Sequence, residues 1–375
     1  MDEPLSSRFD RPMAYWLFTC AAVIIAMIVL GGVTRLTHSG LSMVEWKPLM
    51  GIVPPLGEAA WQEMFAKYQQ FPEYQLVNVG MSLAEFKSIF LFEYAHRVLG
   101  RFIGLLFLLP FLYFVFVGKI QRGMILKLLL MFVLGGLQGL LGWYMVKSGL
   151  VDNPRVSQYR LTAHLGAAVL IYGYILWVAL GLYFAAGDRR VSDAQPARQL
   201  GPGTRYGAFS ISALLYLMIL SGGLVAGTRA GLAYSNWPWM GDSLIPSGLY
   251  ATEPRWLAMF EDITTIQFNH RMLAYLLCVL IVGFVVYVLR RGVTGRLRTG
   301  LQCMLGFLVL QVSLGIATLW FLVPVPLAAA HQGGAILLFT SSLVVSQAFH
   351  QRGRLQQHRS VELVRDHAAE VNKRA

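Results

Sequence analysis

The chain has 375 residues, of which 56% are hydrophobic and only 13% carry a charge. This composition excludes a disordered protein and is typical of an integral membrane protein. The net charge of +12 would also suit a nucleic-acid-binding protein, but the distribution of the basic residues argues against that class.

Eight apolar stretches are each long enough to cross a bilayer, which takes about 20 helical residues. Lipid offers the backbone no hydrogen-bond partners, so we predict that each stretch is an α-helix. The sequence therefore predicts an all-α integral membrane protein with eight transmembrane helices. The predicted spans are 13–33, 92–118, 128–146, 161–185, 207–227, 266–289, 301–323 and 326–349.

Basic residues gather on one side of the predicted membrane. The side with both termini and the connections after even-numbered spans carries 19 Lys and Arg against 8 acidic residues, whereas the other side carries 12 against 11. The positive-inside rule then places both termini in the cytoplasm. The acidic residues of the N-terminus do not suit an organelle transit peptide, so we expect a bacterial cytoplasmic (inner) membrane. The bilayer, and not nucleic acid, is the predicted partner of these cations.

A long outer loop, residues 34–91, follows the first span and leads into Glu93-Tyr94-Ala95-His96-Arg97 at the start of the second. Glu93 and His96 are three residues apart, so they share one face of a helix. Ionisable groups at the edge of the hydrocarbon are costly and usually line a site. His164 lies early in the fourth span.

The second half of the chain repeats the first. His270-Arg271 opens the sixth span and His331 lies early in the eighth. We therefore predict two homologous four-helix bundles related by a pseudo-two-fold axis near the membrane normal. Further matches pair Gln138 with Gln311, Gly142 with Gly315, and Ala163 with Ala330. The predicted parts are the N-terminal half 1–186, a linker 187–205, the C-terminal half 206–350 and a basic cytoplasmic tail 351–375.

The four histidines of these spans are expected at one depth near the outer face, because each precedes the inner end of its span by roughly 18 to 22 residues. A lone intramembrane histidine commonly only hydrogen-bonds a neighbouring helix. Paired histidines on facing helices of a bundle are a known cradle for haem iron. Arg97 and Arg271 are placed to pair with haem propionates. Small residues are expected to let helices pass close to the haem ring: Gly135, Gly136, Gly139, Gly166, Gly333 and Gly334.

The two halves differ three residues before the first histidine, where Glu93 in one half matches Gln267 in the other. A partly desolvated carboxylate can move protons, whereas an amide cannot. This difference favours a reactive N-terminal site and an electron-storing or structural C-terminal site. The alternative for Glu93 is a surface salt bridge with Arg97 at i+4. Alternatives for the whole protein are a membrane b-type cytochrome that relays electrons and a haem carrier.

These residues resemble the haem A synthase family over almost all of residues 13–349. The most specific segments are Gly31-Gly32-Val33-Thr34-Arg35, Glu93-Tyr94-Ala95-His96-Arg97, Trp237-Pro238 and Asn269-His270-Arg271. Some members of the family carry a cysteine pair in the first outer loop. This chain has none there and is similar to the branch that includes the mitochondrial enzymes.

The resemblance implies an enzyme that oxidises a ring methyl of haem O to a formyl group by successive oxygenations, giving haem A for respiratory oxidases. It implies that His270 and His331 hold a resident haem b, the cofactor. It further implies that His96 and His164 flank the substrate haem and that Glu93 is the catalytic carboxylate. Haem O synthase and an unidentified electron donor are the partners it suggests, and a homo-oligomer is left open.

Overall fold

The computed structural model describes residues 10–45, 53–118, 120–149, 156–188 and 200–374. Within these residues the chain is helical, and the one extended pairing is an isolated bridge between Met240 and Ser243. Eight helices are long and apolar enough to cross a membrane, which confirms the predicted fold class. They are α1 (Asp10–Leu36), α4 (Leu83–Phe116), α5 (Arg122–Gly149), α6 (Gln158–Asp188), α7 (Pro202–Thr228), α9 (Ile263–Leu289), α10 (Gly295–Trp320) and α11 (Val325–Arg374).

Several helices extend beyond the spans predicted from hydropathy. Helix α4 begins at Leu83, because Ser82 and Glu85 form a capping box in which each side chain accepts a hydrogen bond from the other's backbone N–H. Helix α11 continues to Arg374, so the described part of the predicted tail is helical. The first nine residues and most of the predicted linker lie outside the described residues.

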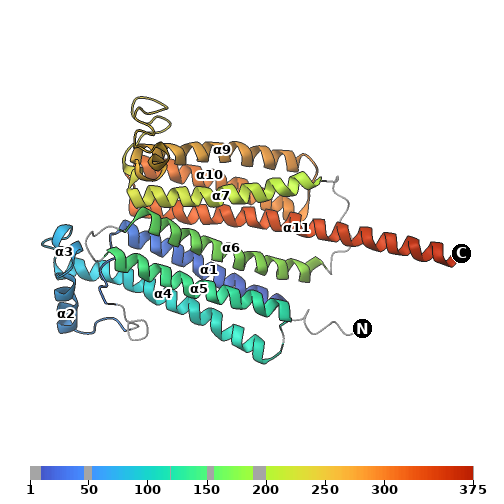
Figure 1. The fold of residues 1–375 in the computed structure, drawn as a ribbon, viewed down its shortest axis with the longest axis horizontal. Coiled ribbons are helices and arrows are strands. Elements are labelled where there is room, and N and C mark those ends of the chain that lie inside the picture. The colour runs from blue at the N-terminus through green and yellow to red at the C-terminus, as the bar shows by residue number, and fades with distance from the viewer. Residues whose placement is uncertain (1–9, 46–52, 119, 150–155, 189–199, 375) are drawn as a thin grey trace.

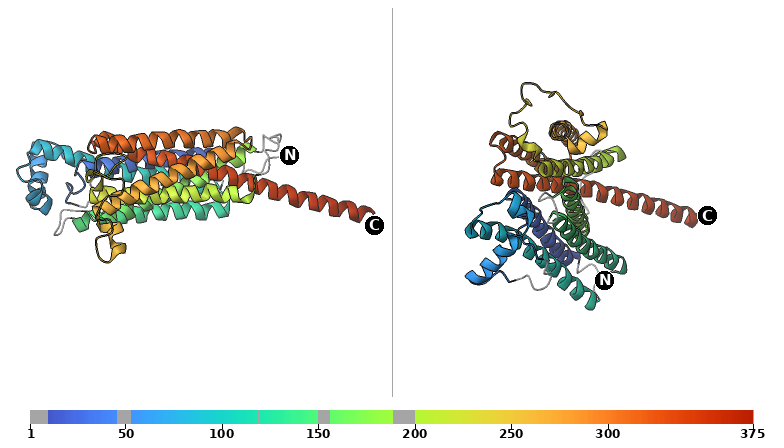
Figure 2. Two further views of the ribbon diagram at one scale, coloured as in Figure 1. Left: turned by 90° about the horizontal axis from the view of Figure 1, so that it is seen from above. Right: turned by 60° about the vertical axis from the view of Figure 1, so that its left-hand side comes forward.

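The transmembrane helices form two groups (Figure 1). Helices α1, α4, α5 and α6 pack together, as do α7, α9, α10 and α11. The groups meet where α1 and α6 contact α11 and where α6 contacts α7, and one hydrophobic core continues through both. The right-hand view of Figure 2 looks obliquely along the helices of the two groups. The two-fold relation between them stays a prediction.

Polar side chains join the two groups inside the membrane region. The hydroxyls of Tyr172 on α6 and Thr340 on α11 lie 2.5 Å apart. The Gln332 amide on α11 donates to the carbonyl of Ile28 on α1 at 2.9 Å. Hydrogen bonds of this kind hold membrane helices together where the hydrophobic effect contributes little.

Two short helices, α2 (Glu58–Tyr68) and α3 (Pro72–Leu76), lie beyond the bundle at the end where α4 begins (Figure 1). We call residues 53–82 the lid. A small aromatic core of Tyr68, Phe86 and Phe90 fixes the lid to the first turns of α4. Lys87 of α4 also pairs with Glu58 of α2 at 3.1 Å. Because α4 begins at Leu83, its first turns are available to pack against the lid.

A second loop covers the same end of the C-terminal group. It contains two 3-10 turns, η2 (Ala230–Leu232) and η3 (Arg255–Leu257), and the short helix α8 (Ala258–Glu261). Asp262 then starts α9, because its carboxylate accepts from the backbone N–H of Thr265 at 2.6 Å. Both loops thus lie at one end of the molecule, opposite the end from which α11 projects (Figure 1).

Candidate haem sites

The N-terminal histidines lie on α4 and α6, each against a glycine of a neighbouring helix. A methyl group added at Gly31 of α1 would lie 3.0 Å from Nε2 of His96. One added at Gly142 of α5 would lie 2.9 Å from Cε1 of His164. The structure therefore packs each imidazole of the predicted pair against a glycine, whose missing side chain leaves room for the ring.

The C-terminal histidines are arranged in the same way. A methyl group at Gly222 of α7 would lie 3.5 Å from Cε1 of His270, and one at Gly315 of α10 would lie 2.9 Å from Cε1 of His331. His164, His270 and His331 all lie within the first turns of their helices, which start at the end with the two loops.

Polar neighbours orient three of the four imidazoles. The Gln138 amide of α5 lies 3.1 Å from Nδ1 of His164 and also donates to the His164 carbonyl at 2.8 Å. The Ser221 hydroxyl lies 3.0 Å from Nδ1 of His270, and the Gln311 amide lies 3.4 Å from Nε2 of His331. A partner on one ring nitrogen fixes the ring and leaves the other nitrogen for a metal.

Glu93 lies at the centre of a buried clasp that ties α4 to the first outer loop. Its carboxylate accepts from the Ser42 hydroxyl and the Met43 N–H, both at 2.8 Å, and from Arg97 at 2.5 and 3.1 Å. Arg97 also donates to the carbonyls of Met43 and Glu45 at 2.9 and 3.2 Å. The predicted i+4 salt bridge is present, but it is buried: the Glu93 side chain is only 4% exposed.

The C-terminal half has a matching clasp without a carboxylate. Arg271 donates to the carbonyls of Tyr234, Asn236 and Trp239 at 2.9, 3.0 and 3.0 Å. The Gln267 amide donates to the same Tyr234 carbonyl at 2.9 Å. Within the described part of the chain, Nε of Arg271 is buried without a hydrogen-bond partner. This half therefore keeps a buried cation whose charge only carbonyl oxygens balance.

Most of the glycines named from the sequence do not touch the histidines. A methyl group at Gly135, Gly136 or Gly139 would meet nothing within 4 Å, so these positions leave open space along α5. Gly166 packs against Leu220 and Tyr216 of α7. Their predicted place beside a haem ring stays a prediction. Sequence reasoning paired Gly142 with Gly315 as a repeat match and did not place these glycines beside the histidines. Their equivalent positions in the two halves were the signal that could have done so.

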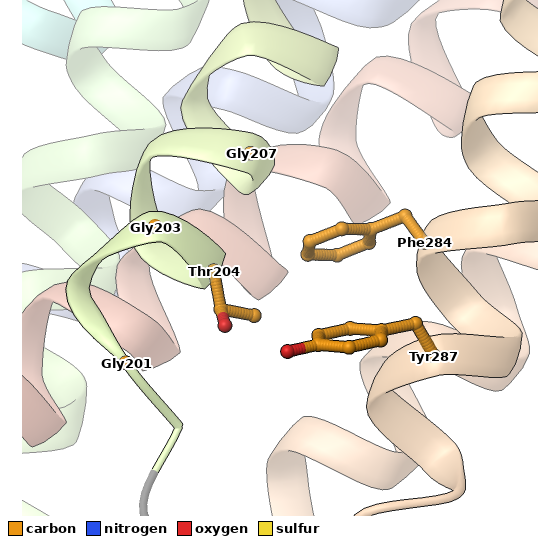
Figure 3. Close-up of a pocket in the computed structure, with 6 residues that line it drawn as sticks. All are labelled: Gly201, Gly203, Thr204, Gly207, Phe284 and Tyr287. Carbon is orange, nitrogen blue, oxygen red and sulfur yellow. The ribbon is translucent and has the colours of Figure 1, made fainter.

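A separate cavity of about 320 Å³ lies between the start of α7 and the end of α9 (Figure 3). Phe284 and Tyr287 form one wall and lie in the last two turns of α9, whereas His270 lies near its start. The other lining residues are Gly201, Gly203, Thr204 and Gly207. This cavity therefore lies at the opposite end of the helices from the histidines.

The chain is similar to known proteins over most of its length. Residues 14–343 match the family model described as cytochrome oxidase assembly protein, COX15-CtaA. A protein named heme A synthase from Nitrosospira multiformis is 50% identical over 343 residues, covering 92% of this chain and 95% of the relative. One from Nitrosomonas eutropha is 49% identical over 334 residues, covering 89% and 92%. One from Paramagnetospirillum magneticum is 47% identical over 351 residues, covering 93% and 96%.

Proposed function

The chain belongs to the cytochrome oxidase assembly protein family, and we propose that it is an enzyme converting haem O to haem A. The observation that carries this proposal is the pair of half-buried histidines in each half, each packed against a glycine, in a chain 50% identical to a protein named heme A synthase. Imidazoles on facing helices suit the axial positions of haem iron. Four such groups, two in each half, suit one substrate haem and one resident haem.

The reaction turns a ring methyl of haem O into a formyl group. Each oxygenation consumes dioxygen, two electrons and two protons and releases one water. The second oxygenation gives a geminal diol, which loses water to leave the aldehyde. The electrons come from a donor outside the chain. What the protein must supply is a fixed position for the methyl group and a controlled path for protons.

We propose that the C-terminal half holds haem b through His270 and His331. When bound, haem b supplies a one-electron store. The contact of Ser221 with Nδ1 of His270 leaves Nε2 available for iron. The buried guanidinium of Arg271, with Nε unpartnered among the described residues, fits the negative charge of a propionate. Ser221, His270 and Arg271 are therefore suited to hold haem b.

The N-terminal half is the proposed reaction site, with His96 and His164 flanking haem O. Glu93 is the proposed catalytic carboxylate, three residues before His96 on the same face of α4. It accepts four hydrogen bonds, which fix its position before substrate binds. Arg97 is already committed to Glu93 and the loop. To contact a propionate as well, the Arg97 guanidinium would have to give up some of its hydrogen bonds to Glu93 or to the loop carbonyls.

The proposed location is a bacterial inner membrane, with the histidine end of the helices at the outer face. Haem O reaches the site from the membrane, and haem O synthase is the proposed source. A cytochrome that carries electrons across the bilayer needs haems at both faces. The histidines lie instead toward one end of the helices, which argues against that alternative.

Pigment analysis tests the proposed function. Membranes are prepared from cells that make haem O, with and without this protein, and the extracted haems are separated by chromatography. We expect haem A only in membranes with the protein. A His96→Ala, His164→Ala variant serves as the matched control and should leave haem O unconverted. Haem O alone in both preparations would reject the enzyme.

A further inference from the structure

The cavity between α7 and α9 contains a buried hydroxyl group that the rest of the protein does not use. Thr204 is only 7% exposed, lines this cavity and points its hydroxyl into it (Figure 3). Thr34, Thr228 and Thr318 each donate to the carbonyl four residues earlier, at 2.8, 2.8 and 2.7 Å. The Thr204 hydroxyl makes no hydrogen bond to the described part of the chain. Burying an unpaired hydroxyl is costly, so this group favours a ligand that brings an acceptor into the cavity.

The start of α7 places a second hydrogen-bond donor at the same cavity. Gly201 is the N-cap and offers no side-chain acceptor, and Pro202 at the first helical position has no N–H. The Thr204 N–H donates to the Gly201 carbonyl at 3.0 Å, so among the described residues the N–H of Gly203 is the first one left without a helix partner. A methyl group added at Gly201 or Gly203 would meet nothing within 4 Å, so the approach to this N–H is open. Unpaired N–H groups at the start of a helix favour an anionic ligand.

The chain around the cavity is basic. Segments 200–210 and 280–300 contain no acidic residue, and their arginines are Arg205, Arg290, Arg291, Arg296 and Arg298. The guanidinium carbon of Arg291 lies 4.7 Å from the centre of the Tyr287 ring, which forms part of the cavity wall. Arg205 faces α11 instead, where its Nη2 lies 3.2 Å from Nδ1 of His350. A guanidinium, a hydroxyl and a backbone N–H beside one cavity suit the oxygens of a phosphate group.

The cavity lies at the depth where lipid headgroups meet acyl chains. Its polar residues precede the predicted span that begins at residue 207, whereas Phe284 lies within the predicted span 266–289. Leu280 and Leu276 lie one and two turns before Phe284 on the same face of α9, and both are exposed. An apolar surface facing the bilayer therefore continues from the polar cavity. Its volume of about 320 Å³ lies within the range of small-ligand sites, about 300–1,000 Å³.

We propose that this cavity binds an anionic phospholipid. The lipid phosphate accepts hydrogen bonds from the Gly203 N–H, the Thr204 hydroxyl and the Arg291 guanidinium. One acyl chain follows Phe284 and Leu280 along α9 toward the middle of the bilayer. Basic pockets between membrane helices bind lipid headgroups in this way. The inference does not depend on the proposed function or on which side of the membrane this end faces, because both leaflets contain phosphate groups.

Native mass spectrometry of the purified full-length protein tests the site. The protein is stripped of lipid in detergent and titrated with phosphatidylglycerol, which is anionic, or with phosphatidylcholine, which has no net charge. We expect the first phosphatidylglycerol to bind at least about fivefold more tightly than phosphatidylcholine. Thr204→Val keeps the shape of the side chain and removes its hydroxyl, and Arg291→Gln removes the cation. Each should weaken phosphatidylglycerol binding at least about fivefold.

Thr299→Val and Arg298→Gln are the matched controls, because both residues are exposed in the first turns of α10 at the same end of the molecule. Both controls should bind lipid as the unmodified protein does. Unchanged binding in Thr204→Val and Arg291→Gln would overturn the proposal, and so would an equal loss in the controls or equal affinity for the two lipids. Inorganic phosphate at the concentration of the lipid should leave the lipid bound. Displacement of the lipid would assign the site to a free phosphate and overturn the proposal.

A second measurement uses the unmodified protein alone and does not depend on the folding of any variant. A ligand that binds only the native state raises the unfolding temperature. Phosphatidylglycerol should therefore raise the unfolding temperature of the stripped protein more than phosphatidylcholine does at the same concentration. Equal shifts with the two lipids, or no shift with either, would overturn the proposal.

Discussion

Glu93 and Gln267 show how one side chain changes the character of a site while its architecture is kept. Each lies four residues before an arginine that holds the carbonyls of an outer loop. In the N-terminal half a carboxylate neutralises Arg97. In the C-terminal half the described residues give Arg271 hydrogen bonds to carbonyl oxygens and leave its Nε without a partner, which supports its proposed role toward a haem propionate. The residue that differs is therefore the one that can take up a proton.

Glu93→Gln is expected to fold and keep haem b but to lose most haem A formation. The fold should survive because the matching clasp already works with Gln267. General acid–base assistance is typically worth about 10²–10⁴-fold, so the loss should be large. Pigment analysis measures it, and Gln267→Glu should change little. Near-normal haem A in Glu93→Gln would reduce Glu93 to a structural partner of Arg97.

His270→Ala and His331→Ala are each expected to remove most of the low-spin b-type spectrum of the purified protein. A low-spin haem iron needs both strong axial ligands, so loss of either imidazole should suffice. His350→Ala is the control, because His350 packs on Trp177 near the opposite end of the bundle. A full spectrum in both ligand variants would reject the haem b assignment.

At the scale of the helix, glycine decides how close a neighbour comes to an imidazole. The histidine helices could be predicted from the sequence, because the repeat places the four residues in matching spans. The glycines that touch the imidazoles could not be predicted, because glycines also serve ordinary helix packing in membranes. Only the packing of α5 on α6 and of α10 on α11 shows that Gly142 and Gly315 face the rings.

Gly142→Ala and Gly315→Ala should therefore each impair one of the two haem sites. Each added methyl would lie 2.9 Å from a histidine ring, so the ring must move away from its position. We expect Gly315→Ala to lower haem b content, and Gly142→Ala to lower haem A formation while haem b stays. Gly139→Ala on α5 is the control, because its methyl meets nothing within 4 Å. Equal effects at all three positions would show that the rings are not restrained by these glycines.

At the scale of the molecule, hydropathy and repeat matching predicted the eight membrane helices, because lipid leaves the backbone no other structure. They did not predict the buried clasps. A salt bridge between Glu93 and Arg97 follows from their spacing, but its burial follows from the loop segment Ser42–Glu45 folding over α4. Contacts between residues about 50 positions apart leave no periodic pattern in the sequence.

The two loops and the histidine ends of the helices share one end of the bundle, so they must lie on the same side of the membrane. Both outer loops and the N-terminal ends of α4, α6, α9 and α11 lie at one end (Figure 1). The distribution of Lys and Arg predicts that this end faces away from the cytoplasm. On that prediction, electrons and haem O reach a site near the outer face.

Cysteine labelling in spheroplasts tests this orientation. The three native cysteines, Cys20, Cys278 and Cys303, are first replaced by alanine. Val79 in the lid is 71% exposed, and Thr294 lies at the start of α10 at the other end. Val79→Cys should react with an impermeant thiol reagent in intact spheroplasts, and Thr294→Cys only after lysis. The reverse pattern would place the lid and all four histidines at the cytoplasmic face.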